Sequence, residues 1–387
     1  MRLVNFTADN NLTLLHCGAE YFPALVKALD EAKLEIYLET YIFAADEIGD
    51  LIKATLKRAA ARGVVVNVIV DWLGTGDAYT KALAKEFSEA KIQYRIFNPW
   101  FKRGVTRSHR KMCVVDRQIA FVGGLNINND IRADHDFHMI LPLPRWDFAV
   151  RIVGPLVAKI HLESEAQWMR IGRLKLRLRL ELFREVRQVP VIGSGAPAHA
   201  GLVVRDNFRN RRTIQKTYLH ALGHARKTAL LANPYFAPGR KMRDALASAA
   251  ARGVDVTLLL GVGQFRLQDA IAHAFYPKLL KSGVKIIEYR KTQLHAKIAV
   301  VDDHWSTVGS SNVDGFSLFV NQEANVVVQD SAFSNKLREK IEQGIAEGVM
   351  VKLEDFANIP WYKRVWYDAA LTLYRITIRV ITWGNNA

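Results

Sequence analysis

Residues 109–116 read HRKMCVVD, and residues 295–302 read HAKIAVVD. Both stretches have a histidine, a lysine two residues later and an aspartate five residues after the lysine, at a constant offset of 186 (295 − 109). A glycine-rich turn that ends in asparagine follows each copy at the same distance, at Gly123–Asn126 and Gly309–Asn312. Two copies in one register are far more specific than a single H-x-K-x4-D pattern. The repeat therefore predicts two copies of one structural unit that share a single active site.

The residue types in this repeat suit phosphodiester chemistry. Imidazole can act as a nucleophile and as a proton shuttle near neutral pH, so one histidine can attack phosphorus while the other protonates the leaving alcohol. Residues two apart on a strand face the same side, which directs each lysine into the cleft of its histidine. Ammonium and amide groups would hold the non-bridging oxygens without a metal ion. The expected phosphate-handling residues are His109, Lys111, Asn126, His295, Lys297 and Asn312.

Three further acids are expected to have other roles. Asp116 and Asp302 stand at odd offset from the lysine and at a strand end, because Asp116-Arg117 and Asp302-Asp303 look like hairpin turns. This position favours a structural or ion-pairing role over contact with substrate. Glu39 lies in the middle of an expected strand, where an acid needs a partner, and it is a candidate for the substrate pocket.

A carboxylate on the second ring nitrogen usually fixes the tautomer of a nucleophilic histidine. In the second half, Glu323 opens an apolar run, and we expect it to orient His295. In the first half, Asp147 opens the corresponding run, and we expect it to orient His109. Asp136 is an alternative, because its separation from His109 is closer to that of Glu323 from His295. Asp147 is preferred because the strand and helix that follow it match the second half better.

With these residues in view, the chain resembles the phospholipase D superfamily, and within it the bacterial cardiolipin synthases of the shorter type B branch. The resemblance extends from about Leu12 to about Leu353. One departure is Cys113, at a strand position that is usually aliphatic in the family. The stretches that carry the resemblance are Leu38–Phe43, His109–Lys111, Gly124–Asn126, Gly154-Pro155, Ala232–Phe236, Asp302–Trp305 and Gly309–Asn312.

The resemblance implies a reaction and a set of site residues. The reaction is transfer of a phosphatidyl group between two phosphatidylglycerols, which gives cardiolipin and glycerol through a phosphohistidine and without a cofactor. By analogy with the family, His109 is the favoured nucleophile. A phospholipase D-type hydrolase or transferase of another phospholipid, and a phosphodiesterase acting on nucleic acid, are the alternatives. The implied catalytic residues are His109, Lys111, Asp116, His295, Lys297 and Asp302.

Charge and composition bear on the partner. A net charge of +16 favours an anionic partner, either a membrane surface or nucleic acid. Basic residues alternate with leucine over 173–180, and arginines alternate with apolar and aromatic residues over 361–383. Both patterns favour an anionic lipid interface over nucleic acid. The sequence has no apolar stretch of transmembrane or signal-peptide length, and its two cysteines indicate a reducing compartment. We therefore expect a peripheral protein on the cytoplasmic side of the cell membrane, with its oligomeric state open.

Helical and strand patterns alternate along both halves, which predicts an α/β fold. Arg62-Gly63-Val64 and Arg252-Gly253-Val254 mark matching turns from helix into strand. We expect two tandem α/β sandwich domains with mixed sheets, related by a pseudo-twofold axis that passes through the active site. The expected divisions are a first domain over 1–169, a basic linker over 170–200, a second domain over 201–355 and an aromatic, basic tail over 356–387, which is a candidate membrane-interface helix.

Overall fold

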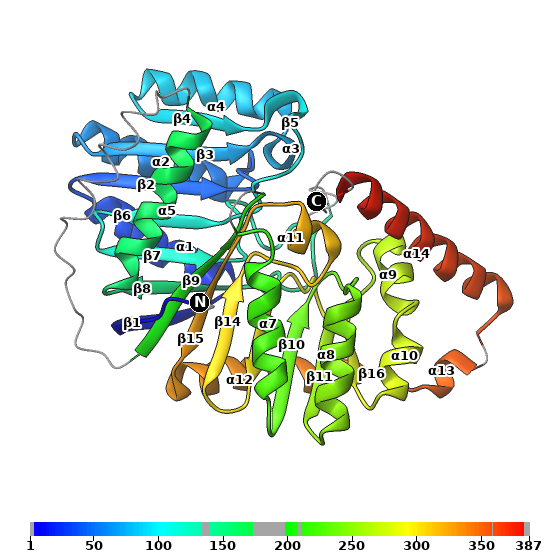
Figure 1. Ribbon diagram of the computed structural model, residues 1–387. Coiled ribbons are helices and arrows are strands. Elements are labelled where there is room, and N and C mark those ends of the chain that lie inside the picture. The colour runs from blue at the N-terminus through cyan, green and yellow to red at the C-terminus, as the bar shows by residue number, and fades with distance from the viewer. Residues whose placement is uncertain (1–3, 134–138, 173–197, 208–209, 358, 383–387) are drawn as a thin grey trace.

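The computed structural model describes residues 4–133, 139–172, 198–207, 210–357 and 359–382. Its elements follow the chain in two series (Figure 1). The first series is β1 (Thr7–His16), α1 (Cys17–Glu31), β2 (Glu35–Thr40), α2 (Glu47–Ala61), β3 (Val65–Asp71), α3 (Trp72–Thr75), α4 (Asp77–Glu89), β4 (Gln93–Phe97), the 3₁₀ turn η1 (Pro99–Phe101), β5 (Lys102–Val105), β6 (Met112–Val115), β7 (Ile119–Gly123), β8 (Phe148–Val153) and α5 (Leu156–Ile171).

The second series repeats this order and then adds a tail. It consists of β9 (Ala198–Arg205), α7 (Thr213–His224), β10 (Thr228–Asn233), α8 (Arg240–Ala251), β11 (Asp255–Gly261), α9 (Arg266–His273), α10 (Tyr276–Lys281), β12 (Lys285–Tyr289), β13 (Ile298–Val301), β14 (Trp305–Gly309), α11 (Gly315–Phe319), β15 (Glu323–Gln329), α12 (Ser331–Ala346) and β16 (Val349–Met350). The tail contains α13 (Glu354–Ala357) and α14 (Trp361–Thr382).

The strands of the two series have one topology. In the first half their order is β1-β8-β7-β6-β2-β3-β4, and in the second it is β9-β15-β14-β13-β10-β11-β12, with β16 at the edge. Parallel pairs join β2 to β3 and β3 to β4, as they join β10 to β11 and β11 to β12, and the other pairs are antiparallel. The predicted α/β fold with two repeats and mixed sheets is confirmed.

The two halves join through β1 and β9, which the sequence patterns did not reveal as strands. These strands pair antiparallel, with Thr7 opposite Ala200 and Asn10 opposite Ala198. Asn10 is fully buried, and its amide donates to the Ala198 carbonyl while its Oδ1 accepts from the Leu156 N–H at the start of α5. The pairing makes one 15-stranded sheet out of the two predicted ones.

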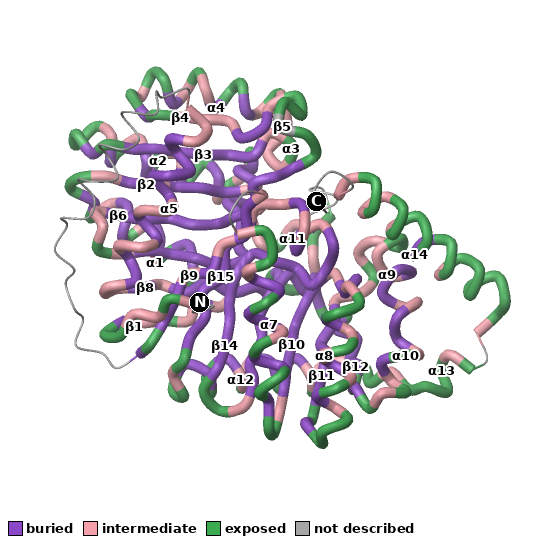
Figure 2. Tube along the Cα trace, viewed as in Figure 1, coloured by how far each residue is buried: buried purple, intermediate pink, exposed green. Residues whose placement is uncertain are grey.

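The halves also pack face to face. One apolar core takes side chains from β6, β7 and β8 and from β10, β13, β14 and β15, with α5 and α12 beside them. Separate cores lie under α1, α2 and α4 in the first half and under α7 to α10 in the second. Figure 2 shows these strands buried and the outer helices exposed on one side. A shared core of this kind holds the two halves in one fixed relation.

Glycine turns follow the matching helices α2 and α8, and aspartates cap the starts of other helices, as Asp330 does for α12. Gly63 and Gly253 have φ values of +91° and +88°, and in both turns the next residue donates back to the last helical turn, as from Val64 to Ala59 and from Val254 to Ala249. This is the helix-ending turn that the sequence predicted. The expected linker lies outside the described residues over 173–197, while α5 ends at Ile171 and β9 begins at Ala198.

Candidate active site

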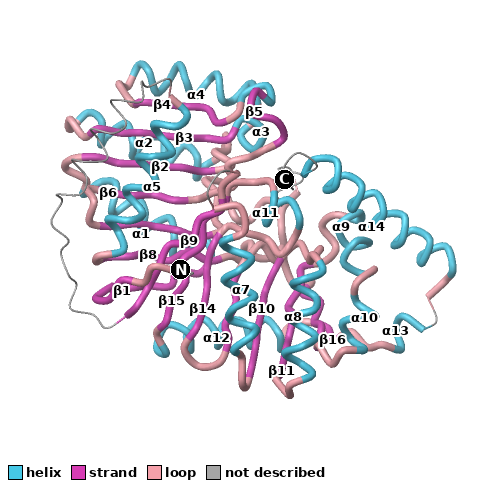
Figure 3. Tube along the Cα trace, in the orientation of Figure 1, coloured by secondary structure: helices cyan, strands magenta, loops and turns pink. Residues whose placement is uncertain are grey.

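Two backbone bridges between the halves build the centre of the site, where loops gather between the strands (Figure 3). The N–H of His109 donates to the Gln322 carbonyl at 2.9 Å, and the Gln322 N–H donates to the Arg107 carbonyl at 2.7 Å. The second bridge repeats this geometry, because His295 N–H donates to the Trp146 carbonyl at 2.9 Å. Each histidine is thereby fixed beside the residue that precedes the carboxylate of the other half.

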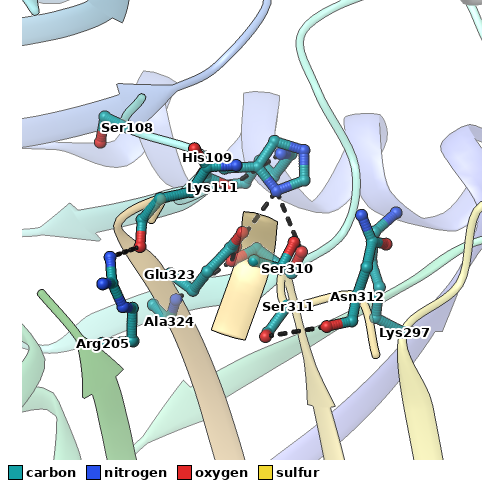
Figure 4. A network of polar contacts seen from close by, with 12 residues as sticks. Ser108, His109, Lys111, Arg205, Lys297, Ser310, Ser311, Asn312, Glu323 and Ala324 are labelled. Atoms are coloured by element: carbon teal, nitrogen blue, oxygen red, sulfur yellow. Dashed lines mark hydrogen bonds and ion pairs between the residues drawn. The ribbon is translucent and has the colours of Figure 1, made fainter. Parts of the chain in front are cut away.

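The carboxylates therefore pair with the histidines crosswise. His109 Nδ1 lies 3.1 Å from Glu323 Oε2, and His295 Nδ1 lies 2.6 Å from Asp147 Oδ2. The expectation that each carboxylate serves the histidine of its own half is wrong, because the backbone bridges connect opposite halves. Asp136, the alternative partner, lies outside the described residues. Figure 4 shows the contact between His109 and Glu323.

This pairing fixes the tautomer of each ring. A carboxylate on Nδ1 keeps the proton there and leaves the Nε2 lone pair available. Burial lowers the pKa of His109 despite the nearby Glu323 carboxylate, which favours the neutral, nucleophilic imidazole. Burial alone would raise the pKa of Glu323, but the His109 ring, the Lys111 ammonium and the Ser310 hydroxyl together lower that pKa. Burial raises the pKa of Asp147 to about 6, against the attraction of Lys297.

Ser310 and Gly124 occupy matching positions beside the two carboxylates. The Ser310 hydroxyl donates to Glu323 Oε2 at 2.5 Å and accepts from the Ala324 N–H at 3.0 Å. A Cβ at Gly124 would lie only 2.2 Å from Asp147 Oδ1, so this position must stay glycine. The two turns of the repeat, GGLN and GSSN, already differ at this position, with Gly124 in one and Ser310 in the other. The reason for the difference becomes clear only when the carboxylate beside each residue is known.

The lysines fold back over their histidines. Lys111 Nζ donates to the His109 carbonyl at 2.8 Å, and Lys297 Nζ donates to the His295 carbonyl. Both lysines are buried, at 3% and 0% exposure. Lys111 also lies over the Tyr41 ring, with Nζ 5.2 Å from its centroid. Two buried ammonium groups beside two imidazoles make a strong binding position for an anion.

The two asparagines of the repeat are buried with polar atoms to spare. Asn126 Oδ1 accepts from the Ile42 N–H at 3.2 Å, while its Nδ2 has no partner among the described residues. Asn312 Oδ1 is likewise buried without a partner in the described part of the chain. Figure 4 shows Asn312 and Lys297 together near the ring of His109. Buried amides of this kind need a partner, and phosphate oxygens would satisfy the Asn126 amide.

Asp116 and Asp302 have a structural position. Asp116 accepts from the N–H groups of Lys33, Leu34 and Glu35 at 2.8 to 2.9 Å, and Asp302 accepts from those of Arg226, Lys227 and Thr228. Each carboxylate thus fixes the start of the neighbouring strand, β2 or β10. Both bind backbone at the turn ends of β6 and β13, which supports the structural role favoured by their position over the catalytic role that the resemblance implied.

Glu39 belongs to a buried polar cluster behind the histidine segment. It is 3% exposed, and its Oε1 accepts from the Ser108 hydroxyl at 2.5 Å and from Gln167 Nε2 at 3.4 Å. Gln167 also donates to Gln322, the residue that bridges to His109. Through Ser108, which precedes His109, Glu39 helps to position the histidine segment. Its Oε2 is buried without a partner among the described residues, so a role of Glu39 in the substrate pocket stays a prediction.

Arg205 is a site-shaping residue that no sequence pattern indicated. It stands at the end of β9, is 1% exposed, and donates to the carbonyls of Phe319 and Asn321, just before Glu323. In the register of β15 and β9 it lies opposite Glu323. Arg205 belongs to no sequence motif, and the strand that holds it was not predicted. Its role can therefore be recognised only from the fold.

Comparison with known proteins identifies the family. The family model described as "Cardiolipin synthase, PLD-like domain" matches residues 25–145 and 218–345, which include both copies of the repeat. The chain belongs to the cardiolipin synthases of the phospholipase D superfamily. Enzymes of this family are phosphatidyltransferases, so the predicted family and reaction class are confirmed.

Individual relatives agree with this assignment. A cardiolipin synthase B from Salmonella typhi is 35% identical over 369 residues, which cover 93% of this chain and 85% of that protein. Cardiolipin synthase B of Escherichia coli K12 is 36% identical over 366 residues with the same two coverages. Among solved structures, a phosphatidylserine synthase of Haemophilus influenzae has a TM-score of 0.68 over 97% of this chain and 95% of its own, at 15% identity. The last comparison supports the fold of this cardiolipin synthase family member.

Asp302→Ala should lower the free energy of unfolding by about 1–3 kcal/mol, because three backbone N–H groups lose a charged acceptor. The folded variant should keep most of its kcat. Burial alone would raise the pKa of Asp302, but the N–H donors outweigh it and lower that pKa. Its contribution is therefore present at neutral pH and is lost as the pH falls through the lowered pKa.

Denaturant unfolding at pH 7 and pH 3 measures this effect. Asp303→Ala is the matched control, because Asp303 is exposed and pairs with Lys227 at the surface. Equal stability of the two variants, or a folded Asp302→Ala protein without activity, would contradict the structural role.

Activity should fall as the pH drops below about 6. Asp147 then takes a proton, because burial holds its pKa near 6, and it no longer accepts from His295 Nδ1. Glu323, whose pKa is lowered, should stay ionised over this range. A pH profile of kcat between 5 and 8 checks this, with Asp147→Asn as the variant whose residual activity lacks the inflection. A flat profile down to pH 5 contradicts the assignment.

Proposed function

We propose that the protein transfers a phosphatidyl group from one phosphatidylglycerol to another, giving cardiolipin and glycerol. The observation that carries the proposal is the pair of imidazoles, each held through Nδ1 by a carboxylate of the opposite half. A neutral ring with an available Nε2 atom can serve as the nucleophile, and a second ring that carries a proton on Nε2 can serve as the general acid, in one site. The family to which the chain belongs supports the phospholipid substrate.

The first step forms the covalent intermediate. His109 Nε2 attacks phosphorus of the donor, and the bond from phosphorus to the glycerol oxygen breaks. The protonated ring of His295 gives its Nε2 proton to that oxygen, so glycerol leaves neutral. Lys111, Lys297 and the Asn126 amide would bind the non-bridging oxygens as charge builds on them.

The second step releases the product. The hydroxyl of the acceptor phosphatidylglycerol loses its proton to His295 Nε2 and its oxygen bonds to phosphorus. The bond from phosphorus to His109 Nε2 breaks, and cardiolipin leaves. Both rings return to their starting protonation states, so no further reactant is needed. Water in place of the acceptor would give phosphatidic acid by the same path.

Phosphatidylglycerol liposomes test the proposed reaction. Incubation with the purified protein should give a lipid with two phosphorus atoms and one glycerol for each such lipid. Phosphatidic acid and free glycerol as the sole products would show that the protein is a hydrolase and not a synthase. If phosphatidylglycerol liposomes give neither product and liposomes of a phospholipid with another headgroup are cleaved, the donor is that other phospholipid.

A peripheral position at the anionic cytoplasmic surface of the cell membrane is the second part of the proposal, and α14 supports it. Residues separated by seven, three and four along α14 expose an apolar stripe, with Trp366 at 48%, Leu373 at 58%, Ile376 at 55% and Val380 at 62%. A different face, with Ala370 and Leu371 buried, packs on the second half. Figure 1 shows α14 along one side of the molecule.

Basic residues accompany the stripe. Arg375 and Arg379, four residues apart on α14, are exposed beside it. An exposed apolar stripe next to arginines is typical of a helix that lies in an anionic membrane interface. None of the described helices is both long enough and apolar enough to cross a membrane. The basic stretch over 173–180 lies outside the described residues.

Replacing Trp366 and Ile376 together by serine should weaken binding to phosphatidylglycerol liposomes at least tenfold, because two apolar side chains leave the interface. Co-sedimentation measures the change. Leu34→Ser, at a 64% exposed leucine of the first half, is the control and should bind like the parent protein. Unchanged binding of the α14 variant would exclude this helix as the membrane contact.

A further inference from the structure

A hollow of about 230 Å³ lies between α9, α11 and α14. Leu267 and Ile271 of α9, Phe316 of α11 and Leu373 of α14 line it with Phe236. Asp314 also reaches the hollow, but its carboxylate already accepts from the Ser317 N–H at 2.7 Å as the cap of α11. The remaining surface is mainly carbon, which suits an apolar ligand.

The hollow shares its wall with the active site. Phe236 pairs with Val313 in a backbone bridge, and the Ala237 N–H donates to the Val313 carbonyl at 3.0 Å. Val313 directly follows Asn312, one of the two asparagines of the repeat. The Tyr374 hydroxyl of α14 accepts from the Gly315 N–H at 2.5 Å, in the same loop. A ligand in the hollow would thus contact the segment that carries Asn312, since Asp314 and Phe316 of that segment line the hollow.

The hollow also opens towards the exposed stripe of α14. Leu267 and Leu373 line it and are 44% and 58% exposed, so they form its rim. Leu373 belongs to the apolar stripe as well as to the hollow. One apolar surface therefore runs from the outside of α14 to the back of the Asn312 loop.

The first half has a matching hollow with different chemistry. Phe43 bridges to Ile127 as Phe236 bridges to Val313, and each phenylalanine lines a hollow. In the first half, however, the lining includes Asp46, Glu47 and Asp50. These charged side chains, with Arg132 beside them, make that hollow unsuited to an apolar chain. Of the two matching hollows, the apolar one is therefore the one on the side of the molecule that carries α14.

We propose that the hollow between α9, α11 and α14 receives an acyl chain of the phospholipid while its phosphate lies between the histidines. The inference rests on the proposed function, since it names a binding position for the same substrate. The occupant must be apolar to match the lining and must be joined to a phosphate to reach the Asn312 loop. An acyl chain of a phospholipid meets both conditions, and the interface helix would deliver it from the bilayer.

Calorimetric binding of alkyl phosphates tests the inference without any reaction. Ethyl, butyl, hexyl and octyl phosphate are the probes, at concentrations where each is monomeric. Each methylene that enters the hollow should raise the affinity by up to about fourfold. Leu267→Trp should fill the rim, keep the affinity for ethyl phosphate and bind octyl phosphate at least tenfold more weakly than the parent. Leu51→Trp, at a 41% exposed leucine of α2, is the matched control and should follow the parent.

The outcomes separate the hollow from the reaction. Equal dependence on chain length in Leu267→Trp and in the parent protein would overturn the inference, and so would no dependence in the parent. Loss of ethyl phosphate binding in Leu267→Trp would show damage to the phosphate position and would also count against it. The liposome assay tests the reaction by itself, so a protein that fails there but shows the predicted chain dependence loses the proposed function and keeps the acyl site.

Discussion

His109→Ala should abolish the covalent phosphoryl-enzyme and lower kcat by at least about 10⁴-fold. The ring of His109 is held through Nδ1 by Glu323, and burial keeps its pKa low, so its Nε2 carries a lone pair at neutral pH. His295 is held by the carboxylate of the first half, and in the proposed mechanism it serves as acid and base, so we expect no replacement of that nitrogen. Acid-sensitive, base-stable labelling from a donor with radioactive phosphorus measures the intermediate.

His295→Ala provides the matched comparison. Loss of the general acid should slow glycerol release by about 10²–10⁴-fold. A p-nitrophenyl phosphodiester needs no proton on its leaving group, so with this donor His295→Ala should still form the phosphoryl-enzyme and then accumulate it, since the acceptor step lacks its base. Labelling of His109→Ala and absence of label in His295→Ala would assign the nucleophile to His295.

The sequence predicted well which residues of the repeat gather in one place, because they lie in short patterns. The imidazoles, lysines and asparagines recur at a fixed offset, and the structure places His109, Lys111, Asn312 and Lys297 together (Figure 4). The structural role favoured for Asp116 follows from the turn beside it, and its three backbone contacts agree. Local rules of this kind survive folding because they depend on neighbours in the chain.

The partners of the histidines could not be predicted, because they depend on how the halves meet. That relation is set by the pairing of β1 with β9 and by a core shared between the two faces. β1 reads TADNNLTLLH, whose polar first half hides the strand, and its buried Asn10 bonds across the joint. Spacing within one half therefore suggested the wrong carboxylate for each ring. The contact of Glu39 with Gln167 was hidden for a related reason, since Gln167 lies on a helix far away in the chain.

Glu323→Gln should slow formation of the phosphoryl-enzyme by about 10³–10⁴-fold, and Asp147→Asn should leave this step less affected but slow the transfer to the acceptor. The amide of glutamine can donate to Nδ1, which favours the tautomer with its proton on Nε2 and removes the nucleophilic lone pair. Since Glu323 contacts His109 across the halves, the loss should fall on the step that His109 carries. Single-turnover kinetics with the p-nitrophenyl donor separate the two steps.

Proton NMR of the protein with labelled histidines can test the crosswise pairing directly, apart from turnover. The Nδ1–H of a ring bonded to a buried carboxylate should resonate far downfield, and His109→Ala and His295→Ala assign the two signals. Glu323→Gln should remove the His109 signal and keep that of His295, while Asp147→Asn should do the reverse. If Asp147→Asn removes the His109 signal instead, the carboxylates serve their own halves. Each half of the chain could then orient its own histidine without the other half. Crosswise pairing instead requires both halves to orient either ring.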